Sequence, residues 1–250
     1  MLVAAYTDCF PTLPLQESIS KLVDLEYSNI EIPLHEHRDF LKPSQIADNL
    51  DEAINTCLDT LRMTVVNYNL QIRATGEEYY RQFEACCKLA KATKVVTLTV
   101  ESGEFGTPFN EEVERLRRLV QIGELEGVRV SMKSEAGRLT EDPDTVAVLC
   151  DNVKGLGLTL DPSHYICGPH GGKSIDKLIK YVYHTQLRDT SKEHLQVRVG
   201  QGEVEYGRLV NLLQKSGYSR TLCVDIRPLD GIDHMAEMRK MRLLLESLLL

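Results

Sequence analysis

Residues Leu139–Tyr165, LTEDPDTVAVLCDNVKGLGLTLDPSHY, contain the repeating unit from which the chain is built. Asp142 followed by Pro143 is a helix start, because Asp caps the first turn and Pro fits the first helical position. A helical stretch follows, and the short apolar run Leu158–Asp161 then predicts a buried parallel strand. The strand ends in the polar sequence Asp-Pro-Ser-His at 161–164. One unit is therefore a helix, a buried strand and a polar strand end.

Outward from this unit, short β-rich runs alternate with helical stretches along the whole chain. The runs expected to be strands are Leu2–Tyr6, Asn29–Ile32, Thr64–Tyr68, Val95–Val100, Val128–Lys133, Leu158–Asp161, Val182–Leu187 and Thr221–Ile226. The helical stretches expected between them are Leu15–Glu26, Ser44–Arg62, Gly76–Lys91, Glu111–Glu126, one beginning at Pro143, Lys173–Lys180, Glu205–Ser216 and Asp233–Leu249. Eight strands alternating with about eight helices in about 250 residues predict an α/β fold, the (β/α)8 TIM barrel.

No linker rich in Pro, Ser or Gly interrupts this alternation, so residues 1–250 are expected to form a single domain. A doubly wound open sheet is the alternative fold, but it usually has fewer strands, and the Gly-rich phosphate fingerprint is missing after the first strand. Thr75 with Glu78 fits a capping box at a helix start. The apolar tail 236–250 is expected to cover the barrel, and a homodimer interface is the other possibility.

Composition restricts the classes of partner. The chain of 250 residues has 29 Lys plus Arg against 37 Asp plus Glu, a net charge of −8. This acidic excess argues against a nucleic-acid partner and against an anionic membrane surface, since both need a basic surface. No apolar run reaches transmembrane length, and the N-terminus lacks the basic region of a signal peptide. The seven cysteines form no C-x-x-C pair, which is typical of reduced thiols in a protein of the cytoplasm.

Polar side chains end most of the predicted strands. In a (β/α)8 barrel the carboxyl ends of the strands line the active site, and residues two apart on a strand share one face. Both signs of charge therefore meet at the predicted mouth of the barrel, from Glu31, Asn67, Asn69, Glu101, Lys133, Glu135, Asp161, His164, His184, Gln186, Arg188, Asp225 and Arg227. Burying such a set is costly unless the groups pair or bind a ligand, so the set predicts a functional site. His35-Glu36-His37 follows the second strand and is expected to be a solvated loop.

Four segments carry a family resemblance: LPLQESISKLVDLEYSNIEI at 13–32, the quoted residues 139–165, HTQLRDT at 184–190 and VGQGEVEYGRLVNLLQKSGYSRTLCVDI at 199–226. With these segments the chain resembles the sugar phosphate isomerase/epimerase family of xylose isomerase-like TIM barrels. The resemblance spans nearly the whole chain. It implies the (β/α)8 fold and a small sugar-like substrate, in a superfamily that hosts isomerases, epimerases, dehydratases and nucleases.

The resemblance also implies a divalent metal (Mn, Mg or Zn), held in that family by Glu on the fifth strand, Asp on the sixth, His on the seventh and Glu on the eighth. Position by position, these fall on Lys133, Asp161, Gln186 and Asp225. Lys repels a cation and Gln is a poor transition-metal ligand, so two of the four positions depart from the pattern. Either Lys133 replaces the metal, which we favour, or a metal lies in a shifted site made by Asp161, Asp225, Glu135 and His164 or His184.

The resemblance and the strand ends together predict an isomerase or epimerase that moves a proton next to a carbonyl through an enediolate. The expected catalytic residues are Lys133, Glu135, His164 and Asp225, and the expected substrate contacts are Glu31, Asn67, His184, Gln186 and Arg188. A lyase or dehydratase on a sugar-like substrate is the nearest variant, because an enediolate can expel a β-hydroxyl. The departures at 133 and 186 also motivate an alternative, a non-catalytic sugar-binding relative with a degraded metal site.

Overall fold

Eight parallel strands close into a barrel in the order of the chain. The computed structural model describes residues 1–250. The strands are β1 (Leu2–Tyr6), β2 (Asn29–His35), β3 (Thr64–Gln71), β4 (Thr97–Val100), β5 (Arg129–Lys133), β6 (Gly157–Leu160), β7 (Val182–Leu187) and β8 (Thr221–Val224). Parallel pairing of β8 with β1 closes the ring. The predicted (β/α)8 barrel is confirmed.

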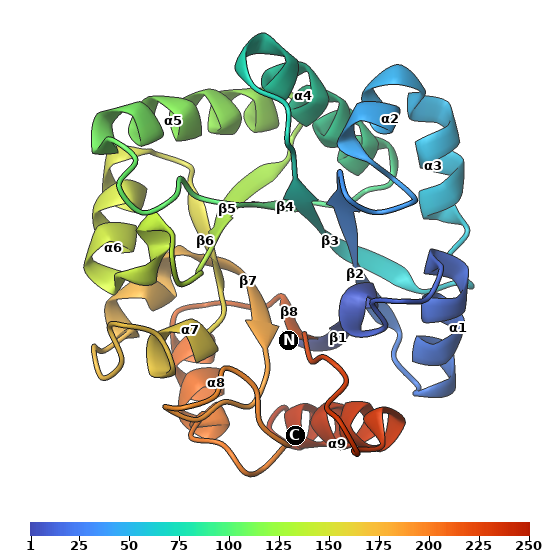
Figure 1. Ribbon diagram of the computed structural model, residues 1–250, viewed down its shortest axis with the longest axis vertical. Helices are drawn as coiled ribbons and strands as arrows, with labels where there is room; N and C mark the ends of the chain where they lie inside the picture. The colour runs from blue at the N-terminus through green and yellow to red at the C-terminus, as the bar shows by residue number, and fades with distance from the viewer.

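Helices surround the barrel on all sides (Figure 1). They are α1 (Leu15–Asp24), α2 (Pro43–Asp48), α3 (Leu50–Leu58), α4 (Gly76–Ala92), α5 (Phe109–Leu125), α6 (Pro143–Asn152), α7 (Ser163–Ile166), α8 (Tyr206–Lys215) and α9 (His234–Ser247). Three short 3-10 helices are η1 (Thr7–Cys9), η2 (Leu139–Glu141) and η3 (Asp176–Tyr181). Strands and helices together bury one continuous cluster of 61 hydrophobic residues, as a chain of this length can without disulfides.

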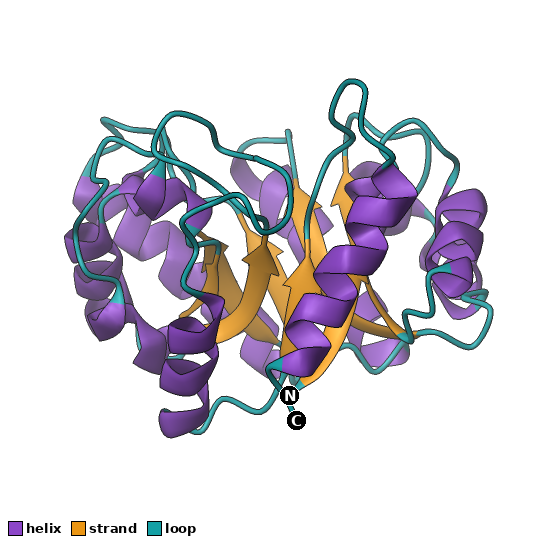
Figure 2. Cartoon of the chain, turned by 90° about the horizontal axis from the view of Figure 1, so that it is seen from below, coloured by secondary structure: helices purple, strands orange, loops and turns teal.

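The two ends of the barrel differ. The strand arrows point toward the end that carries the longer loops, and both chain termini lie at the other end (Figure 2). The last helix, α9, packs against β1 and β8, and Met238 accepts a hydrogen bond from Tyr27 Oη on its carbonyl oxygen at 2.9 Å. The C-terminal tail therefore covers the barrel wall, as expected. No helix combines the length and the apolar character that crossing a membrane requires.

The stretch Ser44–Arg62 is not one helix, contrary to the prediction. The helices α2 and α3 meet at Asn49, which leaves the helical conformation with φ −143° and ψ 80°. Its side chain accepts a hydrogen bond from Glu52 N at 3.3 Å, so Asn49 is the N-cap of a new helix.

The predicted capping box at the start of α4 is also wrong. Thr75 makes no side-chain hydrogen bond to the first turn. Glu78 instead accepts hydrogen bonds from Arg81 at 2.7 Å and from Gln82 at 2.9 Å. A charge-assisted bond to a guanidinium is stronger than a bond to a neutral backbone N–H, so the arginine takes the carboxylate.

A buried aspartate holds the loop that follows β7. Asp189 is 2% exposed, and its Oδ2 accepts hydrogen bonds from Gly200 N at 2.7 Å and from Gly202 N at 3.0 Å. A Cβ added at Gly202 would lie 2.1 Å from Asp189 Oδ1 and 2.5 Å from the carbonyl oxygen of Thr190. The close approach to Asp189 therefore requires glycine at position 202, and it fixes the backbone next to Arg188.

Replacing this glycine should destabilise the fold. We expect Gly202→Ala to lower the free energy of unfolding by about 2–4 kcal/mol, because overpacking adds to the loss of buried hydrogen bonds. Gly207→Ala in α8 is the matched control, since nothing lies within 4 Å of a Cβ there and a helix prefers Ala by up to about 1 kcal/mol. Urea denaturation measures both variants, and equal stability of the two would contradict the packing argument.

Candidate active site

Glu31 of β2 is the centre of a buried hydrogen-bonded group inside the barrel. It is 0% exposed and accepts hydrogen bonds from His184 Nε2 and Gln186 Nε2 at 2.7 Å each, and from Asn69 Nδ2 at 3.2 Å. Burial on its own would raise the pKa of Glu31, but the charge and the hydrogen bond of His184 outweigh it and lower the pKa. His184 and Gln186 thus share one face of β7, as their spacing predicts, and both bind an ionised carboxylate.

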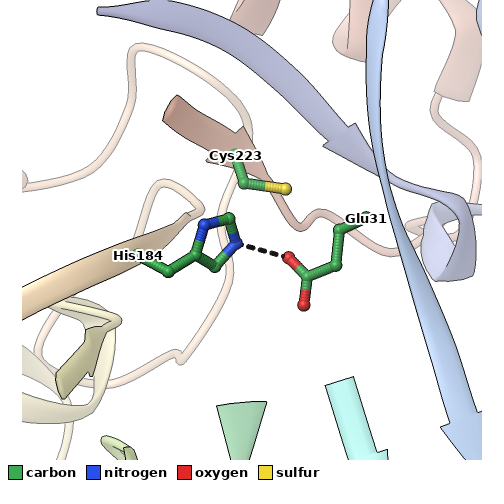
Figure 3. A group of neighbouring side chains, drawn as sticks. All are labelled: Glu31, His184 and Cys223. Carbon is green, nitrogen blue, oxygen red and sulfur yellow. Dashed lines mark hydrogen bonds and ion pairs between the residues drawn. The ribbon is translucent and has the colours of Figure 1, made fainter. Parts of the chain in front are cut away.

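Cys223 of β8 lies beside this pair. Figure 3 shows the His184 ring and the Glu31 carboxylate pointing toward one another, with the Cys223 sulfur next to them. These three residues bring one ligand atom each within 4.8 Å of the others, and no other group of His, Cys, Asp or Glu does so. Burial raises the pKa of the Cys223 thiol, so it remains protonated. The direct Glu31–His184 bond already satisfies these groups without a cation.

Hydroxyl groups fill a neighbouring part of the barrel interior. Thr159 Oγ1 lies 2.7 Å from both Thr99 Oγ1 and Ser131 Oγ. Asn67 donates a hydrogen bond to Thr99 Oγ1 at 2.9 Å and is 0% exposed. The structure therefore places Asn67, one of the expected substrate contacts, in a buried network of side chains, where its Oδ1 has no hydrogen-bond partner.

Arg188, after β7, joins two buried aspartates at the neighbouring strand ends. Its Nη2 lies 3.0 Å from Oδ2 of Asp161, after β6, and 2.6 Å from Oδ2 of Asp225, after β8. Both aspartates are 0% exposed and Arg188 is 7% exposed. Burial would raise the pKa of Asp225, but the charges of Arg188 and Arg227 hold it well below its usual range. Burial would also lower the pKa of Arg188, but the two carboxylates raise it.

The outer oxygens of the two aspartates have partners of their own. Asp161 Oδ1 accepts hydrogen bonds from Ser163 N at 3.0 Å and from Ser163 Oγ at 2.5 Å. Asp225 Oδ1 lies 3.4 Å from Arg227 Nη2, and Arg227 Nη1 lies 2.6 Å from Asp8 Oδ2. An ionic network therefore links the ends of β6, β7, β8 and β1.

His164 of α7 faces Asp161. Its Nε2 lies 3.6 Å from Asp161 Oδ2, and its Nδ1 accepts a hydrogen bond from Ala136 N at 3.2 Å. Because Nδ1 accepts, the neutral ring carries its hydrogen on Nε2. Burial lowers the pKa of His164, against the opposing effect of Asp161. The imidazole is therefore a neutral hydrogen-bond donor at neutral pH.

Lys133 ends β5 and lies among these groups. Its charge contributes to the lowered pKa values of Asp225, His164 and His35. No carboxylate oxygen lies within 4.0 Å of its Nζ, whereas Arg188 pairs with two aspartates. The ammonium of Lys133 is therefore an unpaired positive charge at the strand ends.

Glu135, two residues beyond Lys133, lies at the rim. Its Oε2 accepts a hydrogen bond from Arg138 Nε at 3.0 Å, and its side chain is 31% exposed. Arg138 also pairs with Glu101 at 2.9 Å. Glu101 and Arg138, but not Glu135, line a cavity of about 190 Å³ at the ends of β3 and β4.

His35 belongs to the hydrogen-bonded group around Glu31, although the sequence predicted a solvated loop at 35–37. β2 continues to His35, so Glu31, Pro33 and His35 share its inner face. His35 Nε2 lies 3.2 Å from Asn69 Oδ1, and because the Asn69 amide donates to Glu31, its oxygen accepts from His35 Nε2. Burial lowers the pKa of His35 to about 4, so the ring is neutral and its Nδ1 keeps a lone pair. The spacing of four from Glu31 was the signal that could have found it.

Residues 19–242 match the family described as xylose isomerase-like TIM barrel. The chain belongs to this family. Solved structures that share the fold include the IolI protein with a bound zinc atom, which is 18% identical with a TM-score of 0.75 over 99% of this chain and 98% of that one. D-psicose 3-epimerase with D-tagatose from Clostridium cellulolyticum H10 is 13% identical, with a TM-score of 0.74 over 100% of this chain and 99% of that one. The probable 3-DHS dehydratase AsbF from Bacillus anthracis is also 13% identical, with a TM-score of 0.74 over 98% of this chain and 99% of that one. No curated protein matches the sequence.

The residues at the four usual metal positions of the family do not fit a divalent cation in this chain. Lys133 and Gln186 stand at two positions, and Arg188 Nη2 lies between the carboxylates at the other two. Two carboxylates and two cationic side chains already balance to zero charge. A divalent ion would add uncompensated positive charge to a buried site.

His35 makes the fold sensitive to acid. In the unfolded chain its pKa is close to the ordinary value of 6.5, but in the fold it is about 4. Between these values the unfolded state binds a proton that the folded state does not, so stability falls as the pH falls, by up to about 3 kcal/mol. We expect His35→Asn to reduce this slope, measured by urea denaturation at neutral pH and at about pH 5. His194→Asn, an exposed control, should keep the slope, and an unchanged slope in His35→Asn would contradict the assignment.

Proposed function

We propose that the protein is an enzyme that moves a proton at the carbon next to the carbonyl group of a sugar or small keto acid, as an isomerase or epimerase. Its place in the xylose isomerase-like family and its fold likeness to a D-psicose 3-epimerase support this class of reaction. The observation that carries the proposal is the ammonium of Lys133, which no carboxylate pairs, together with the neutral His164, whose pKa burial and also the charge of Lys133 lower, at the carboxyl ends of the strands.

In this proposal, Lys133 and His164 bind the carbonyl oxygen of the substrate. When the α-proton leaves, negative charge develops on that oxygen, and preorganised donors stabilise it more strongly than they stabilise the neutral carbonyl. The ammonium of Lys133 supplies charge. His164 supplies its Nε2–H, which the hydrogen bond from Ala136 N to Nδ1 keeps in the donor tautomer. A neutral imidazole can act in this way because it does not lose its proton in the ground state.

The proton itself needs a base, and epimerisation needs a second group on the opposite face of the carbon. The proposal assigns these roles to Glu135, which follows β5, and to His35, which ends β2. In the closed ring of eight, β2 and β5 are three strands apart, so the two groups approach the mouth from well-separated sides. Asp225, an expected catalytic residue, is held ionised by Arg188 at 2.6 Å and is a weaker base, so the proposal gives it the role of positioning Arg188.

The remaining expected contacts support the site from inside. Glu31 binds both His184 and Gln186, and it orients His35 through Asn69. In this proposal these side chains keep the proton-transfer groups in position, and the substrate meets Lys133, His164, Glu135 and His35 first.

Hydrogen exchange tests the proposal. Chelator-treated protein is incubated in deuterated water with a panel of ketoses, aldoses and sugar acids, and NMR follows the α-carbon signal. We expect stereospecific deuterium incorporation with at least one compound, together with an isomeric product. Loss of water from the substrate would identify the lyase variant of the same first step. No exchange with any compound, with or without added metal ions, would contradict the proposal.

Lys133→Met should then lower kcat by about 10²-fold or more, since it removes the charge that meets the developing oxyanion. Lys154→Met is the matched control, because Lys154 is exposed and precedes the start of β6, at the end of the barrel opposite to Lys133. Equal kcat values for Lys133→Met and the unaltered protein would show that the ammonium does not act in the reaction.

A further inference from the structure

We propose that Arg188 takes the place of a metal ion in this barrel. Its guanidinium is the permanent counter-charge of Asp161 and Asp225, and removing it turns the two aspartates into a divalent-cation site. This inference concerns binding alone and stands whether or not the proposed reaction is correct.

The geometry is that of one cation shared by two carboxylates. A single atom, Nη2 of Arg188, contacts the facing Oδ2 oxygens of Asp161 and Asp225 at 3.0 and 2.6 Å. The shorter contact is a hydrogen bond, and the longer one is an ion pair without hydrogen-bond alignment. Arg188 Nε remains buried without a partner. The two carboxylate charges thus orient the guanidinium, even though this orientation leaves the Nε–H without a hydrogen-bond acceptor.

The backbone fixes this arrangement on both sides. Leu187 of β7 pairs with Val224 of β8, and Asp225 N donates to the Leu187 carbonyl oxygen at 3.0 Å. Asp189 follows Arg188 directly and is tied to the loop at Gly200 and Gly202. Arg188 therefore enters the site from a backbone segment that hydrogen bonds fix on both sides.

Without Arg188, Asp161 would have no Lys or Arg within ion-pair distance, and Asp225 would keep only Arg227 at 3.4 Å. Both carboxylates are restrained through their outer oxygens: that of Asp161 accepts hydrogen bonds from Ser163, and that of Asp225 makes an ion pair of 3.4 Å with Arg227 without a hydrogen bond. Two fixed carboxylate oxygens with space for water suit Mg²⁺ or Mn²⁺, which accept oxygen ligands and retain several waters. An Arg188→Ala side chain leaves that space.

Calorimetric titration of chelator-treated protein with Mn²⁺ tests this inference. The unaltered protein should show no saturable binding. Arg188→Ala should bind about one equivalent with a Kd on the order of 10⁻⁵–10⁻⁴ M, in the range of carboxylate sites. Arg188→Lys retains the charge and should bind none. The double variant Arg188→Ala/Asp225→Asn loses one of the two ligands and should fall back to no measurable binding.

If Arg188→Ala is too unstable for calorimetric titration, thermal unfolding can measure the binding of Mn²⁺ instead. At millimolar Mn²⁺ its melting temperature should rise by about 3–8 °C, because the ion binds the folded state, while that of the unaltered protein stays constant. One equivalent of Mn²⁺ bound by the unaltered protein and lost in Asp161→Asn would overturn the inference. The inference would also be overturned if the Arg188→Ala variant neither binds Mn²⁺ nor gains stability from it.

Discussion

The ion pair of Arg188 with Asp161 and Asp225 is the interaction on which the mouth of this barrel depends. It joins the ends of three adjacent strands, and Arg227 extends it to Asp8 beyond β1. Buried carboxylates are tolerated only with a cation or several donors close by. Here the cation belongs to the chain itself. Arg188 and Lys133 together balance the two aspartates without a bound ion, and Lys133, which makes no ion pair with them, is the positive group available to a substrate.

A second hydrogen-bonded network connects Glu31, in the barrel interior, to His35, one of the proposed proton-transfer groups. Glu31 accepts hydrogen bonds from His184 and Gln186. It also accepts one from the Asn69 amide, so the Asn69 oxygen is left to accept from His35 and orient it. One buried carboxylate thereby decides which nitrogen of a neighbouring imidazole carries the hydrogen. His164 is oriented in the same manner by a backbone N–H. The two histidines differ in role because Nδ1 is engaged in His164, whereas Nε2 is engaged in His35.

Periodicity in the sequence was sufficient for the fold, because each buried strand is a short apolar run and each helix has a separate apolar face. It was also sufficient to bring Glu31, Lys133, Asp161, His184 and Asp225 to the inside of the strands. It did not show that Arg188 reaches across to two neighbouring strands, since that depends on the stagger between strands and on side-chain rotamers. It also missed His35, because Pro33 within the run looks like a strand end, and it missed the helix break at Asn49, where a local cap outweighs a continuous amphipathic pattern.

The position of Arg188 can be observed directly. Crystals of the unaltered protein grown and soaked with Mn²⁺ allow an anomalous difference map at the manganese absorption edge. We expect no anomalous peak between Asp161 and Asp225, and guanidinium density of Arg188 in contact with both carboxylates. A peak within about 2.3 Å of the two Oδ2 oxygens, with the Arg188 side chain turned away, would contradict it.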